Sequence, residues 1–164
     1  MYEVISDLKL LDRFDLTIDT DYSITVSGYQ GSWVTLDGTS GKAKLTSTAM
    51  ASGGDPLSWP VWNEENRDGT QGYTPDVGET GKITVISGPH RAITDRYDHG
   101  TTFSVGDVLV ATVGTDVGGT NSYGQLDKYT GTNNAVIKAV VIKAPYSYKP
   151  VGGSARNCLM IQVL

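Results

Sequence analysis

Apolar and polar residues alternate in the first part of the chain. Residues 14–18 read Phe-Asp-Leu-Thr-Ile, and residues 22–26 read Tyr-Ser-Ile-Thr-Val. Successive side chains of a strand point to opposite faces, so this alternation predicts half-buried β-strands. A third strand is predicted at 33–36. It ends at Asp37-Gly38, a dipeptide that favours a tight hairpin turn into a fourth strand at 42–46.

The second half of the chain contains further runs of β-branched and apolar residues between glycine-rich corners. The predicted strands are 82–86, 103–113, 125–129, 135–143 and 157–164. The chain has 20 glycines, which suits short strands joined by many turns. The spacing leaves little room for crossover helices. We therefore predict an all-β fold, a small antiparallel barrel or sandwich of β-tulip type with a long ordered loop or arm.

Three parts of the chain differ in pattern. Residues 1–49 are expected to form an N-terminal arm with β-hairpins, and the first ten residues fit a short helix or an extended arm equally well. Residues 50–81 are rich in Gly and Pro yet contain large aromatics, which predicts a long ordered loop rather than a flexible linker. Residues 82–164 are expected to form the main barrel module, in one compact unit with 1–49.

The aromatic residues of the loop have three interpretations. Trp59, Trp62 and Tyr73 suit a sugar-binding platform, a protein interface, or internal packing of the loop. If residues 59–62 are extended, the two indoles point to opposite faces. The residues predicted to lie at an interface are Trp59, Pro60, Trp62, Tyr73, Tyr2 and Leu8.

Charge and cysteine content exclude several classes of function. The net charge is −5 and basic residues are scattered singly, so nucleic acid and a polybasic membrane anchor are not expected as partners. No apolar run is long enough to span a membrane, and no signal peptide is visible. The single cysteine, Cys158, lies in an apolar run and is predicted to be a buried structural thiol.

The richest polar cluster spans residues 90–99. A catalytic or metal-binding interpretation would use His90, Asp95, Asp98 and His99, whose side chains suit several divalent metals. Their spacing matches no known site pattern, so a polar loop is the favoured interpretation. We accordingly expect no metal, no cofactor and no enzymatic activity.

The second half also resembles a known family. Residues 103–109 form a strand with a Gly-Asp corner, residues 124–126 read Gly-Gln-Leu, residues 136–141 are rich in Ile, Val and Ala, and residues 158–164 close the chain. In strand order and apolar spacing this segment resembles the head decoration (cement) proteins of tailed bacteriophages. In that family a strand follows a Gly-Asp corner, and the chain runs through a variable hairpin and returns on a strand rich in Ile, Val and Ala. The long insertion at 50–81 is absent from the smallest members of that family.

The resemblance implies a homotrimer on the outer surface of the capsid. Such a protein binds where subunits of the major capsid protein meet and stabilises the shell without catalysis or cofactor. It would be assembled in the cytoplasm of the bacterial host. The alternative, which rests on Trp59, Trp62 and Tyr73, is a carbohydrate-binding or host-adhesion module of a phage tail or fibre.

Overall fold

The computed structural model contains only β-strands as regular elements in the residues that it describes. These residues are 1–5, 11–17, 31–36, 40–46, 58–62, 82–116, 118–131, 136–150 and 153–164. The strands are β1 (Tyr2–Val4), β2 (Asp12–Thr17), β3 (Trp33–Leu36), β4 (Ala43–Leu45), β5 (Ser58–Pro60), β6 (Lys82–Ser87), β7 (His90–Thr94), β8 (Val108–Thr115), β9 (Asn121–Lys128), β10 (Ala139–Tyr148) and β11 (Arg156–Val163). The predicted all-β fold is confirmed.

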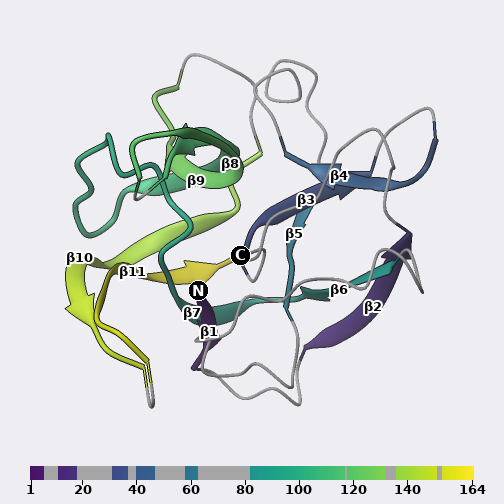
Figure 1. The fold of residues 1–164 in the computed structure, drawn as a ribbon, viewed down its shortest axis with the longest axis horizontal. Helices are drawn as coiled ribbons and strands as arrows, with labels where there is room; N and C mark the ends of the chain where they lie inside the picture. The colour runs from purple at the N-terminus through teal and green to yellow at the C-terminus, as the bar shows by residue number, and fades with distance from the viewer. Residues whose placement is uncertain are drawn as a thin grey trace.

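Six strands form one curled antiparallel sheet, in the order β1-β7-β11-β10-β8-β9 (Figure 1). Its last strand bends back to the segment that follows β7. The amide of Leu126 in β9 donates to the carbonyl of Arg96 at 3.0 Å, and the amide of Asp98 donates to the carbonyl of Leu126 at 2.8 Å. These bonds flank a parallel bridge between Tyr97 and Leu126. The sheet is therefore a half-barrel closed by one short crossing.

The remaining strands form two smaller sheets that are joined to each other. One pairs β2 with β6, and the other has the order β4-β3-β5. A bridge between Val61 and Val85 links them, and the amide of Trp62 donates to the carbonyl of Thr84 at 3.0 Å. The chain passes from β6 to β7 through Gly88 and Pro89, so the small sheets continue directly into the half-barrel.

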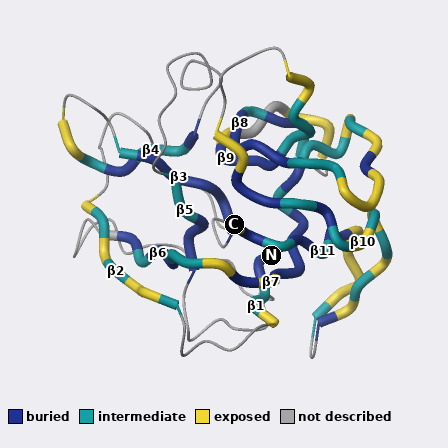
Figure 2. Tube along the Cα trace, turned by 180° about the vertical axis from the view of Figure 1, so that it is seen from behind, coloured by how far each residue is buried: buried dark blue, intermediate teal, exposed yellow. Residues whose placement is uncertain are grey.

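Among the described residues, three apolar clusters hold these sheets together. Figure 2 shows that buried residues follow the inner strands, among them β3, β7 and β8. The largest joins the half-barrel to the inner face of the small sheets and includes Trp33, Trp62, Leu126 and Ile161. A second lies within the small sheets. Its members are Val34, Ala43, Val61, Ile83 and Val85, with Phe14, Leu16, Leu45 and Trp59 partly buried against them. The third covers the opposite side of β7 and β11, and consists of Met1, Ile93 and Cys158, with Tyr146, Tyr148 and Met160 packed against them.

Several strand boundaries differ from those predicted. Residues 103–107 form a turn rather than the start of β8, and Oδ2 of Asp107 accepts a hydrogen bond from the amide of Ser104 at 2.8 Å. β10 begins four residues later than predicted and extends to Tyr148. It passes Pro145, which lies at a register shift where the ladder does not require its missing N–H.

Two strands occur where a loop was predicted. β5 lies inside segment 50–81, and β7 occupies the first half of the polar cluster at 90–99. Residues 2–4, for which a helix or an extended arm was expected, are extended and pair with β7 as a strand of the sheet. Predictions for residues 6–10, 18–30, 37–39, 47–57 and 63–81 lie outside the described residues; they include the strand at 22–26, the turn at 37–38, Leu8 and Tyr73.

Candidate functional site

His90 is the first residue of the polar cluster, and its ring links β7 to β1. Nδ1 lies 2.7 Å from the carbonyl oxygen of Gly88 and therefore donates the hydrogen. Nε2 is then an acceptor, and the hydroxyl of Tyr2 donates to it at 2.7 Å. Burial lowers the pKa of His90, although the hydrogen bond to Gly88 acts in the opposite direction. Burial also raises the pKa of Tyr2. Both ring nitrogens thus have partners: Nδ1 binds the turn before β7, and Nε2 joins β7 to β1.

Asp95 follows β7 and is surrounded by positive charge. Its Oδ1 accepts a hydrogen bond from the α-amino group of Met1, and its Oδ2 accepts one from Nη1 of Arg156 at 2.8 Å. Nε of Arg96 lies 3.7 Å from Oδ1. Burial opposes the ionisation of Asp95, but the charges of Met1 and Arg96 and the two hydrogen bonds outweigh it, so its pKa is lowered. Desolvation lowers the pKa of the Met1 amino group to about 6, although the charge of Asp95 acts in the opposite direction.

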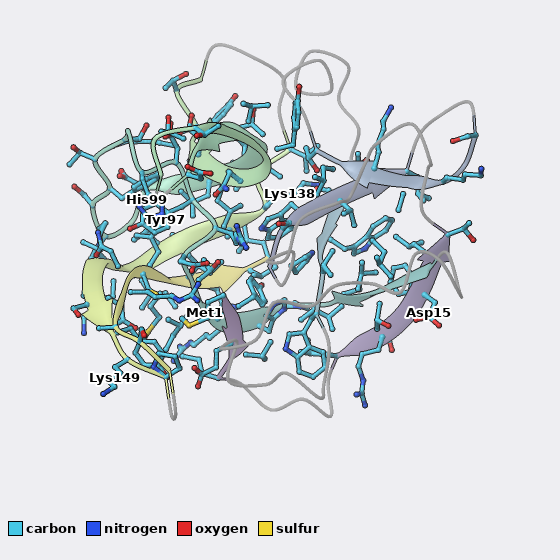
Figure 3. The ribbon with its side chains drawn as sticks, viewed as in Figure 1. Met1, Asp15, Tyr97, His99, Lys138 and Lys149 are labelled. Atoms are coloured by element: carbon cyan, nitrogen blue, oxygen red, sulfur yellow. The ribbon has the colours of Figure 1, made fainter. Side chains whose placement is uncertain are left out.

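Asp98 and His99 shape the chain where it crosses to β9. Oδ1 of Asp98 accepts hydrogen bonds from the amides of Gly100 at 2.8 Å and Thr115 at 2.9 Å. Burial opposes its ionisation, but these bonds prevail and the pKa of Asp98 is lowered. The ring of His99 stacks on that of Tyr97, with centroids 4.1 Å apart (Figure 3). These contacts fix the crossing that closes the half-barrel.

The four residues that a catalytic or metal-binding interpretation would use therefore make separate structural contacts. His90 binds Tyr2, Asp95 binds the N-terminus, and Asp98 and His99 order the crossing. Within the described ranges, no group of three or more His, Cys, Asp or Glu side chains is placed to hold a metal ion. The geometry agrees with a structural role for the cluster, although its first half is a strand and not a loop.

The residues predicted to form an interface have different surroundings. Tyr2 and Trp62 are 0% and 2% exposed, and Pro60 is also buried. Trp59 is half-buried, and its ring meets that of Phe14 edge to face with centroids 5.2 Å apart. Trp59 belongs to the cluster within the small sheets and Trp62 to the largest cluster, so the two indoles do point to opposite faces. The interface role stays a prediction, but within this chain Tyr2 and Trp62 are core residues.

The structure also presents a surface of exposed apolar side chains that the sequence did not predict. Val136, Ile137 and Leu164 are 37%, 38% and 61% exposed, and we call them the C-terminal rim. The amide of Leu164 donates to the carbonyl of Lys138 at 3.0 Å, which places the end of β11 beside the start of β10. The apolar ending Val163-Leu164 predicts a strand tied into the sheet, but nothing in the pattern shows that Leu164 remains exposed.

The rim borders a hollow of about 140 Å³ between the half-barrel and the small sheets. Ile137, Lys138 and Leu164 line it from the half-barrel side, and Trp33, Ser58 and Trp59 line it from the small sheets. Exposed apolar side chains thus lie beside a concave surface at this end of the half-barrel.

Comparisons with known proteins give no family for this chain. No family model matches it, and neither a curated protein nor a solved structure does so. Among the residues that the structure describes, no helix is long and apolar enough to cross a membrane.

Proposed function

We propose that this chain decorates and stabilises the outer surface of a tailed-phage capsid by binding where subunits of the major capsid protein meet. The observation that carries the proposal is the C-terminal rim, a group of exposed apolar side chains on a sheet-based body. Exposed apolar groups that lie together are typical of contact surfaces between proteins.

The order of the strands gives further support. The corner at Gly106 and Asp107 leads into β8, which forms a hairpin with β9, and the chain then returns on the apolar strand β10 beside β8. This is the strand order that the resemblance to head decoration proteins implies. The proposal includes the trimeric state that the same resemblance implies.

The hydrogen bonds between distant segments of the chain also suit a protein that stabilises a capsid. The α-amino group of Met1 is hydrogen-bonded to Asp95, and Arg156 at the start of β11 is hydrogen-bonded to the same carboxylate. A protein whose distant segments are hydrogen-bonded to one another resists deformation. On a symmetric shell, weak contacts that are repeated many times also reinforce one another.

The test is co-sedimentation of the purified protein with expanded, undecorated shells of the phage whose genome encodes it. We expect saturable binding, and a variant carrying Ile137→Ser and Leu164→Ser should bind about tenfold more weakly because it loses the apolar rim. The matched control is Val105→Ser, which changes a 68% exposed valine outside the rim and should bind normally.

Two results would contradict the proposal. The first is a wild-type protein that stays in the supernatant at all concentrations. The second is equal loss of binding in the rim variant and in Val105→Ser, which would show that the rim has no special part. Light scattering on the free protein tests the expected trimer separately.

A further inference from the structure

We propose that the hollow beside the C-terminal rim binds one neutral, hydroxylated ring of monosaccharide size. The proposal goes beyond capsid decoration and does not depend on it, because a decorating protein needs no small ligand. It rests on where the hollow lies and on the polar atoms of its wall.

The strand register decides which side chains face the hollow. Trp33 pairs with Pro60, and Thr35 pairs with Ser58. Residues directly opposite in an antiparallel pair share a face, so Trp33, Ser58 and Pro60 lie on one face of the small sheet. Trp33 belongs to the cluster shared with the half-barrel, so this is the face turned toward β10 and β11. Figure 3 shows Lys138 in the region between these two groups of strands.

Two polar groups in this wall have no partner. Nε1 of Trp33 and Oγ of Ser58 are enclosed and make no hydrogen bond. Buried polar groups in proteins are nearly always paired, because an unpaired one loses its hydrogen bonds to water without replacement. Because both belong to residues that line the same hollow, a ligand hydroxyl that enters it can satisfy them with a small adjustment of side chains.

The chemistry of the wall favours a neutral polyol. An indole N–H only donates, whereas a serine hydroxyl both donates and accepts, and sugar hydroxyls match both. Lys138, which is 9% exposed, also lines the hollow. The volume of about 140 Å³ is below the roughly 300–1,000 Å³ of drug-sized pockets, so it admits one ring and not a long chain.

The test is a nuclear magnetic resonance titration of the full chain with methyl glycosides of glucose, galactose and mannose, and with N-acetylglucosamine. We expect at least one of these sugars to shift the amides of residues 58–59, 86–88 and 137–138. The dissociation constant should lie in the millimolar range, as expected for a ligand of this size.

Two variants locate the binding. Ser58→Ala removes one unpaired group and should weaken binding about threefold to tenfold. Ser87→Phe places a ring in the hollow and should abolish the shifts. The control, Ser147→Ala, alters an exposed serine of β10 and should leave binding unchanged.

Three outcomes would overturn the proposal. One is that no sugar in the panel shifts these amides at tens of millimolar. Another is binding that persists unchanged in both Ser58→Ala and Ser87→Phe. The third is that acetate or succinate shifts these amides whereas the sugars do not, which would assign the hollow to a carboxylate. If Ser87→Phe fails to fold, Ser58→Ala still tests the site, because removing one oxygen atom leaves the fold intact.

Discussion

The α-amino group of Met1 donates a hydrogen bond to the carboxylate of Asp95, so the residue just before β1 is hydrogen-bonded to the residue just after β7. The backbone completes the attachment. The amide of Asp95 and the hydroxyl of Thr94 both donate to the carbonyl of Met1, at 3.3 and 3.1 Å. Arg156 joins the same carboxylate from β11. One aspartate therefore connects three neighbouring segments of the six-stranded sheet.

Replacing Asp95 by Asn should destabilise the protein strongly. The substitution leaves the guanidinium of Arg156 without its counter-charge, and below about pH 6 it leaves the ammonium of Met1 without one as well. Removing one partner of a buried ion pair costs roughly 3–5 kcal/mol, and the partial exposure of Arg156 reduces this to about 2–4 kcal/mol. Urea unfolding measures the change. Asp12→Asn, which changes an exposed residue at the start of β2, is the control and should change stability by less than about 0.5 kcal/mol. Equal losses in both variants would refute the role given to Asp95.

Stability should fall as the pH drops from 8 to 5. The pKa of the Met1 amino group is 8.0 when unfolded and about 6 when folded, so between these values the unfolded chain binds a proton that the folded chain does not. This difference corresponds to about 2–3 kcal/mol. The pKa of His90 is lowered from 6.5 by burial, which adds to the loss below pH 6.5. Asp95, whose pKa is lowered from 3.8, adds a further loss only in strong acid.

Urea unfolding at a series of pH values checks this. His90→Gln should flatten the profile below pH 6.5 and leave the part between pH 8 and 7 unchanged. A free energy of unfolding that stays constant or rises as the pH falls from 8 to 6 would show that the amino group is not buried beside Asp95.

Strands with simple alternation could be predicted from the sequence, whereas β7 could not. Phe14 and Leu16 mark β2 because only the apolar positions of that strand are turned inward. In β7 the pattern fails because His90 and Thr94 are buried at its two ends. Their polar atoms are satisfied by Tyr2 and Met1, which are about ninety residues away in the chain. No local pattern can reveal a partner at that separation.

The same limit applies to the candidate site. The opposite orientation of Trp59 and Trp62 follows from strand geometry alone, and the structure confirms it. The hollow depends instead on how the end of β11 meets the β3–β5 pair. That meeting is set by packing between sheets, which the sequence pattern does not encode.

Cys158 should not react with thiol reagents while the protein is folded. The residue is 0% exposed, and burial raises the pKa of its thiol to about 12. Compared with a free cysteine this leaves roughly a thousandfold less thiolate at pH 8, and the thiolate is the reactive form. Labelling with a chromogenic disulfide should therefore be slow in buffer and complete in denaturant. Rapid labelling of the folded protein would show that Met1 and Ile93 do not cover this side chain.

The approach of β9 to β3 can be tested with two matched glycines. Gly124 and Gly119 both have positive φ, +70° and +80°, so alanine is strained at either position, by about 1–2 kcal/mol. They differ in surroundings. A Cβ at Gly124 would lie 2.6 Å from the carbonyl oxygen of Trp33, whereas one at Gly119 would meet nothing within 4 Å. Gly119→Ala should therefore cost only the conformational strain, and Gly124→Ala should cost about 2–5 kcal/mol because β9 must also move away from β3. The difference between the two free energies of unfolding measures that contact. If the two losses are equal, β9 does not pack against β3 in solution.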